Sequence, residues 1–95
     1  MALGPNPLRA GQSLRLAWAG ALPGPDAELE FYDLAGRRVA AVRWSAAAAA
    51  STGVRPEGGS GLILEPAVTA PWPAGIYFAR VRGARAPAAR LVYLR

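Results

Sequence analysis

The chain has 95 residues, enough for one domain with a single hydrophobic core, and contains neither cysteine nor histidine. Their absence excludes disulfides, histidine-dependent catalytic triads, and metal sites built on either side chain. The net charge of +5 rests on 11 arginines without a lysine. These arginines are scattered, as in high-GC coding sequence, and form no basic run of the kind that binds nucleic acid. A weak attraction to acidic polysaccharides or membranes stays open.

The N-terminal residues do not have the pattern of a targeting segment. No stretch reaches the roughly 18 apolar residues of a spanning helix, so we expect no membrane insertion. Met1–Gly4 lacks the charged start and apolar block of a signal peptide, so an exported protein would carry its signal upstream. We expect one domain over residues 1–95, with residues 1–4 as a linker or an added start.

The first elements form around prolines and an alternating strand. Pro5-Asn6-Pro7 is incompatible with a helix or a central strand, and it predicts an extended entry at a sheet edge. The segment Ser13–Trp18 then alternates, which places Leu14, Leu16 and Trp18 on one face of a half-buried strand.

A β-hairpin is the sharpest local signal of the sequence. Residues 27–32 alternate between apolar side chains predicted to point inward (Ala27, Leu29, Phe31) and side chains predicted to face solvent (Glu28, Glu30, Tyr32). Asp33 suits the first position of a type I turn, and Gly36 suits the left-handed position that closes it. The returning strand then runs from Arg37 to about Trp44.

The middle of the chain allows several interpretations. Ser45 is a candidate cap for a short helix over residues 46–50, ended by Gly53, but five residues do not sustain an isolated helix, and a strand or a loop fits equally. Residues 58–61 are expected to form a flexible loop, and Gly61–Glu65 a short apolar strand.

The C-terminal third predicts two strands separated by a turn at 83–87. Ile76–Arg82 places Tyr77, Ala79 and Val81 inward, and Ala89–Leu94 is the last strand. Glycine followed after one residue by tyrosine is typical of a sandwich corner, where the tyrosine hydroxyl bonds to the backbone a few residues upstream. The fold class we predict is therefore all-β, an immunoglobulin-like antiparallel β-sandwich of about seven strands.

The polar and aromatic residues give no catalytic constellation. Glu28 and Glu30 lie about 6.6 Å apart along a strand, a spacing that suits glycoside hydrolysis, but ion pairing with Arg38 is the favoured explanation. The serines lack a histidine, and the other carboxylates are too dispersed for calcium. We expect no enzyme, no cofactor and no metal. Trp18 and Trp44 are expected in the core, whereas Trp72 is either exposed to a ligand or packed over the sandwich end.

Four segments in this order carry a family resemblance: Pro5–Pro7, Phe31–Val39, Pro73–Val81 and Ala89–Arg95. Together they resemble the C-terminal sorting domain of type IX secretion system cargo, and they are similar to the immunoglobulin-like domain of flagellar hook-capping proteins. The chain departs from that pattern at residues 46–60, where polyalanine and a glycine loop replace a compact tryptophan-containing strand.

The resemblance implies a non-catalytic signal that directs an upstream cargo domain through the outer-membrane translocon. The expected location is the cell surface or exterior of a Gram-negative bacterium, reached through the periplasm, with a sortase-like peptidase as a further partner. The residues it implies for translocon recognition are Gly75, Tyr77, Arg90 and Arg95, and those that define the fold are Pro5, Asn6, Pro7, Asp33, Gly36 and Arg37.

For recognition, we expect the last strand to lie at an open sheet edge, where unpaired backbone groups recruit a partner strand. Arg90 and Arg95 would then steer it toward an acidic groove. The alternative is a structural or adhesive immunoglobulin-like spacer, or a carbohydrate-binding module that uses Trp72 and Tyr32.

Overall fold

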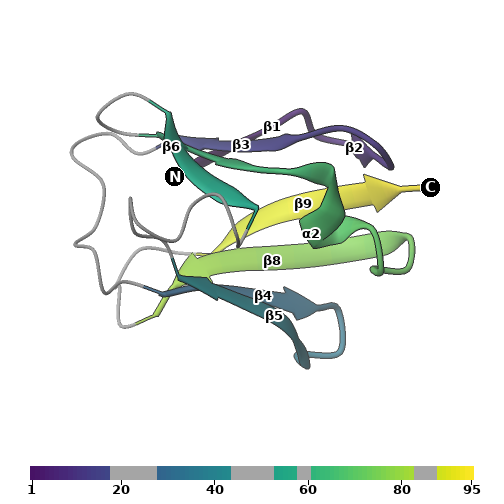
Figure 1. The fold of residues 1–95 in the computed structure, drawn as a ribbon. Helices are drawn as coiled ribbons and strands as arrows, with labels where there is room; N and C mark the ends of the chain where they lie inside the picture. Colours follow the sequence, from purple (N-terminus) through teal and green to yellow (C-terminus); the bar gives the residue numbers. More distant parts are fainter. Residues whose placement is uncertain (18–27, 44–52, 58–60, 83–87) are drawn as a thin grey trace.

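The computed structural model describes residues 1–17, 28–43, 53–57, 61–82 and 88–95, and only the backbone of 55–57. These residues form nine strands and one short helix, arranged as two stacked sheets (Figure 1). The all-β architecture predicted from the sequence is confirmed. The strand number exceeds the seven expected, because very short strands at 2–4 and 8–9 offer too little alternation to be detected.

The first sheet has four antiparallel strands in the order β1-β3-β7-β6. Their bounds are β1 Ala2–Gly4, β3 Leu14–Ala17, β7 Gly61–Leu64 and β6 Val54–Glu57. Leu14 and Leu16 are buried on the inner face of β3, as the alternation predicted. Residues 2–4, which the sequence suggested as a linker, pair with β3.

The second sheet has five strands in the order β2-β9-β8-β4-β5. Their bounds are β2 Leu8–Arg9, β9 Ala89–Leu94, β8 Gly75–Val81, β4 Glu28–Asp33 and β5 Arg38–Arg43. The pairing of β2 with β9 is parallel, which corrects the purely antiparallel expectation; the other pairs are antiparallel. The last strand has the bounds that the sequence predicted.

The core lies between the sheets and takes its side chains from both. Every second residue of β8 points into it, namely Tyr77, Ala79 and Val81, as predicted. Trp72, from the loop before β8, sits among three core aromatics, with ring centroids 5.0 Å from Phe31, 5.0 Å from Tyr77 and 6.3 Å from Tyr93. Such offset and edge contacts stabilise aromatic clusters beyond their buried area.

The hairpin between β4 and β5 has the predicted turn. Gly36 has φ 83°, the left-handed conformation that glycine adopts without strain. The Gly36 N–H donates to the Asp33 carbonyl at 3.0 Å, and the Asp33 N–H donates to the Arg37 carbonyl at 2.9 Å. The Asp33 carboxylate accepts from the N–H groups of Ala35 and Arg37 at 3.0 and 2.9 Å. The carboxylate therefore replaces backbone acceptors within the turn.

The crossing from β7 to β8 contains an element that the sequence did not predict. Helix α2, Pro66–Thr69, is a single turn that begins with proline, where the missing N–H costs nothing. Gly53, at φ 73°, passes so close that an added Cβ would lie 3.0 Å from Val68. No helix in the described part of the chain is long and apolar enough to span a membrane.

Several predictions concern residues outside the described ranges. These are the inward positions Ala27 and Trp18, the core position Trp44, the candidate helix after Ser45, most of the glycine loop, and the turn at 83–87.

Candidate functional site

Tyr77 forms the predicted corner at the start of β8. Its side chain is 3% exposed, and its hydroxyl donates a hydrogen bond to the carbonyl of Pro73, four residues upstream. Burial raises the pKa of the Tyr77 phenol above its usual 10.0, with smaller contributions from Asp33 and Tyr93. The phenol therefore keeps the proton that it donates.

Gly75 begins the same strand and is exposed. Its φ is not in the left-handed region, and a Cβ added there would meet nothing within 4 Å. Neither backbone conformation nor local packing within the described residues requires glycine at this position.

The outer edge of β9 is occupied, which makes the prediction of an open last strand wrong. The Asn6 carboxamide donates to the Arg90 carbonyl at 2.8 Å and accepts from the Val92 N–H at 3.0 Å. Just beyond, β2 pairs with Tyr93 and Leu94, and the Ala10 N–H donates to the Leu94 carbonyl at 2.9 Å. One side chain and a two-residue strand therefore provide hydrogen-bond partners for the backbone groups along this edge.

The proline-flanked Asn6 is thus a structural element, although it bends between the two sheets instead of entering as an extended edge segment. Its bend follows from its path, because the preceding β1 belongs to the four-stranded sheet and the following β2 to the five-stranded sheet. The pairing of Pro5–Pro7 with the last strand joins residues that are 84 and 86 positions apart. No local sequence pattern reveals that partner.

The two arginines predicted for recognition lie in different environments. Arg95 donates through Nη1 to the carbonyls of Ala70 at 3.2 Å and Trp72 at 2.9 Å, so it fixes the loop that carries the buried indole. Arg90 alternates with the buried Leu91 and is exposed on the outer face of the sheet. The structure does not bring them together into one basic site.

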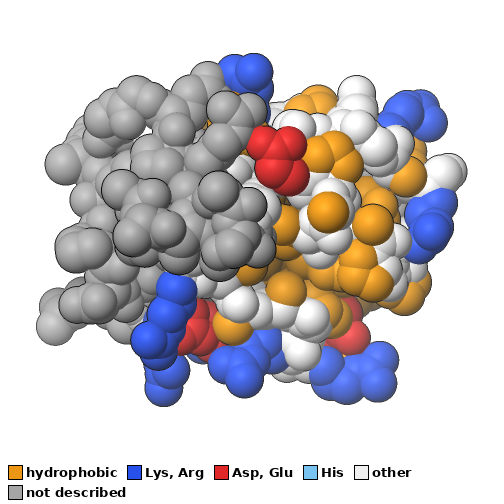
Figure 2. All heavy atoms as spheres, viewed as in Figure 1, with side chains coloured by type: hydrophobic (Ala, Val, Ile, Leu, Met, Phe, Trp, Pro, Cys, Tyr) orange, Lys and Arg blue, Asp and Glu red, His pale blue; other side chains and the backbone are white. Residues whose placement is uncertain are grey.

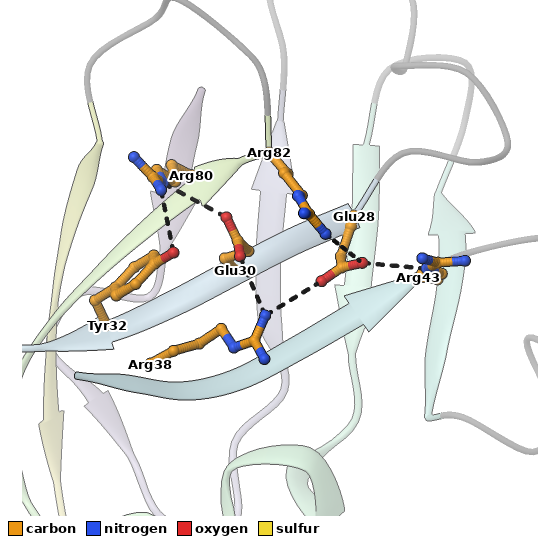
Figure 3. A network of polar contacts seen from close by, with 7 residues as sticks. All are labelled: Glu28, Glu30, Tyr32, Arg38, Arg43, Arg80 and Arg82. Atoms are coloured by element: carbon orange, nitrogen blue, oxygen red, sulfur yellow. Dashed lines mark hydrogen bonds and ion pairs between the residues drawn. The ribbon is translucent and has the colours of Figure 1, made fainter. Parts of the chain in front are cut away.

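The outer face of β4 carries a charge network (Figure 3). Glu28 lies 3.2 Å from Arg43, 3.8 Å from Arg38 and 3.9 Å from Arg82. Arg38 also reaches Glu30 at 3.4 Å, which confirms it as the predicted ion-pair partner of the glutamates.

The network continues across β8 to Tyr32. Arg80 lies 3.6 Å from Glu30, donates to the Tyr32 hydroxyl at 3.1 Å and covers its ring with the guanidinium carbon 4.9 Å from the ring centre. The hydrogen bond with Tyr32, more than the charge of Glu30, raises the pKa of Arg80 above its ordinary value. The face of the Tyr32 ring is therefore engaged by a cation.

Glu30 departs from the prediction that it faces solvent. Although it points away from the core, it is only 4% exposed, and its Oε1 lacks a hydrogen bond within 3.5 Å. The covering arginines come from β5 and β8, so this burial depends on strand pairing that alternation within one strand does not predict. The contacts therefore favour ion pairing as the role of the two glutamates over a catalytic carboxylate pair.

Burial decides between the two alternatives that the sequence left for Trp72. Trp72 is 5% exposed, so it packs inside the sandwich, and the carbohydrate-binding interpretation loses its principal residue. Within the described residues, no cluster of three or more carboxylates is placed to hold a metal ion.

Comparisons with family models, with curated proteins and with solved structures find no match to this chain. The class of protein therefore has to be inferred from the chain itself.

Proposed function

We propose that the chain is an immunoglobulin-like, non-catalytic sorting domain that directs a larger cargo protein through an outer-membrane type IX translocon to the bacterial surface. The strand orders support the fold assignment. Across each sheet, the order β1-β3-β7-β6 matches strands A-B-E-D of an immunoglobulin domain, and β9-β8-β4-β5 matches strands G-F-C-C′. Tyr77 then occupies the place of the tyrosine corner, at the start of strand F.

The observation that carries the functional proposal is where the four resembling segments lie. Phe31–Val39 covers the end of β4, the hairpin turn and the start of β5, whereas Pro73–Val81 covers β8 and Ala89–Arg95 covers β9. Pro5–Pro7 leads into β2 and bonds to β9 through Asn6. Three of the segments therefore lie side by side in one sheet, and the fourth is bonded to its edge, as parts of a single recognition unit would be.

The structure changes how recognition is proposed to occur. Because Asn6 and β2 occupy the edge of β9, a translocon is not expected to add a strand there, and it would instead bind a preformed surface. A hollow of about 370 Å³ lies beside the tyrosine corner, bounded by the hairpin residues Asp33, Leu34 and Arg37 and by Pro73–Tyr77. Gly75 lines it without a packing reason to be glycine, which suits close approach of a partner.

The test is delivery of a reporter in a bacterium with a type IX system. The reporter, preceded by a cleavable export signal, is fused upstream of the chain, and surface and periplasmic fractions are compared. We expect surface delivery with the natural sequence and periplasmic retention with Gly75→Val. Gly4→Val is the matched control, because an added Cβ at Gly4 also meets nothing within 4 Å.

Periplasmic retention of the unaltered fusion, despite a folded and protease-resistant domain, would overturn the sorting function. Surface delivery of Gly75→Val at the natural level would instead remove the hollow as the contact and leave sorting in place.

A structural or adhesive spacer is the second proposal, and the occupied β9 edge favours it. Closed edges prevent neighbouring sandwiches from pairing strand to strand, which a module within a larger protein requires. In that case the unaltered fusion remains periplasmic.

A further inference from the structure

The outer face of the five-stranded sheet carries a marked excess of positive charge. We call this surface the basic face: five arginines, which lie on β5, β8 and β9 and directly after β8, accompany the two glutamates of β4, which leaves a formal charge of +3. Its arginines are Arg38, Arg43, Arg80, Arg82 and Arg90. Figure 2 shows arginine side chains with acidic ones between them along the lower margin, where Figure 1 places β4 and β5.

These arginines keep much of their binding capacity. In the four that contact the glutamates, the side chains are 53–71% exposed. Arg43 contacts Glu28 through Nε, and Arg82 contacts it through Nη1, whereas a guanidinium offers five N–H donors. The two carboxylates order the guanidinium groups without neutralising the face.

An apolar hollow adjoins the basic face. It measures about 290 Å³ and is lined by Phe78, Leu34, Tyr32, Arg80 and Ala88, together with Asp33 and Gly36 of the hairpin. Leu34, at the hairpin tip, is 70% exposed, more than any other large apolar side chain in the described ranges. The Asp33 carboxylate is held by turn amides and by Arg37 at 3.1 Å, so it does not cancel the neighbouring arginines.

We propose that this surface binds an acidic segment of a partner protein that carries a bulky apolar residue. Carboxylates of the segment pair with arginines of the basic face, since planar guanidinium groups bind carboxylates through paired hydrogen bonds. The apolar residue enters the hollow against Phe78 and Leu34. This hollow shares Asp33 and Leu34 with the hollow beside the tyrosine corner, but the arginines of the basic face do not line that second hollow. The proposal therefore holds whether or not the domain sorts cargo.

The combination of features favours a protein over other polyanions. Sulfated polysaccharides and nucleic acids satisfy arginines, but they offer no aliphatic group for the hollow. A nucleic-acid base would stack on an exposed ring, whereas Arg80 already covers Tyr32. Apolar contacts are expected to provide the anchor, and the arginines to raise the association rate and set its salt dependence.

The test uses the full 95-residue chain as bait for a displayed library of random 12-residue peptides, with the best enriched peptide then measured by fluorescence anisotropy. We expect enriched peptides to place Asp or Glu on both sides of a Leu, Ile, Phe or Trp. Two single variants, Leu34→Glu and Arg82→Gln, should each weaken the binding of that peptide by about tenfold or more, which corresponds to about 1.4 kcal/mol of binding free energy. Both side chains are largely exposed, so the variants are expected to fold.

Arg15→Gln is the matched control, because it removes the same charge from an exposed position on the other sheet. It should leave the affinity within twofold. Enrichment of peptides without acidic residues, or equal weakening by Arg15→Gln, would overturn the proposal.

Two further probes distinguish other occupants. Tight, salt-sensitive binding to heparin, or to vesicles of phosphatidylcholine with phosphatidylglycerol, without any enriched acidic peptide would replace the protein partner by a polyanion or a membrane. An absence of binding to the peptide library, to heparin and to the vesicles would also overturn the proposal.

Discussion

The two edges of the five-stranded sheet are finished in different ways. On the β9 side, the Asn6 carboxamide and the short β2 satisfy the backbone. On the β5 side, no described strand follows, and the sequence Arg38–Arg43 presents two valines and two alanines between terminal arginines. One edge is closed by hydrogen bonds, and the other is guarded by charge, which are separate solutions to the hazard of unpaired strands. Disrupting the two edges should therefore have different effects. Disruption of the β9 edge should lower the stability of the domain, and removal of the charges at the β5 edge should allow unwanted association.

The largest expected effect is at the closed edge. Asn6→Ala removes two hydrogen bonds and leaves the Arg90 carbonyl and the Val92 N–H without their partner. At about 1 kcal/mol for each bond, the free energy of unfolding should fall by about 2 kcal/mol, measured by urea denaturation.

Asn6→Asp is the control for that change, because it keeps an acceptor for Val92 but loses the donor to Arg90. Its second carboxylate oxygen faces the Arg90 carbonyl, which is also an acceptor, so the free energy of unfolding should fall at least as far as in Asn6→Ala. If Asn6→Ala has the same free energy of unfolding as the natural protein, β2 alone is enough to close the edge.

Arg95 provides the next effect at the same end of the sheet. Arg95→Gln shortens the side chain that holds the Ala70 and Trp72 carbonyls, and it should lower the free energy of unfolding by about 1 kcal/mol. Arg90→Gln removes an equal charge from the outer face of β9 and should change the free energy of unfolding by less than about 0.5 kcal/mol. Equal losses in the two variants would show that charge, and not the carbonyl contacts, accounts for the effect.

At the charge-guarded edge, the effect is on association more than on stability. A variant with Arg38→Ala and Arg43→Ala should form dimers or larger species at concentrations where the natural protein is monomeric, as measured by light scattering after gel filtration. The double variant Arg80→Ala, Arg82→Ala removes the same charge from the interior strand β8 and from the residue that follows it, and serves as control. If both variants associate to the same extent, net charge and not edge protection prevents association between copies of the protein.

The smallest effect concerns the hairpin that leads into β5. Hydrogen bonding from the Arg37 backbone N–H, opposed by desolvation and aided by the charge of Arg37, lowers the pKa of Asp33 below 3.8. Its contribution to stability is therefore present above about pH 4 and is lost as the pH falls through the lowered pKa. Asp33→Asn should flatten the acid limb of a thermal-denaturation profile between pH 5 and pH 2. An unchanged limb would show that this carboxylate does not contribute to the acid sensitivity of the fold.

The sequence was informative where a structural cause is local. Alternation identified the inward residues of β3 and β8, and Asp33 with Gly36 identified the turn, because each depends on neighbours a few residues away. The tyrosine corner was predictable for the same reason, since Tyr77 bonds only four residues upstream.

The remaining features depend on contacts between distant segments. Glu30 is buried by arginines from two other strands, Arg95 reaches back more than twenty residues to a loop, and β2 is too short to show a period. Trp72 was ambiguous because its prolines indicate a loop, while its burial is decided by aromatic side chains from three strands. The candidate surfaces are of this second kind, so they emerge only in three dimensions.

The bond between Asn6 and the last strand also bears on how the domain folds. Asn6 cannot meet its partners, 84 and 86 positions later in the sequence, until those residues have also left the ribosome. Such distant pairing is slow to form. During synthesis, the Asn6 carboxamide therefore lacks its partners until residues 90 and 92 emerge, and a nascent chain bound by a chaperone over that interval would keep the sheet incomplete.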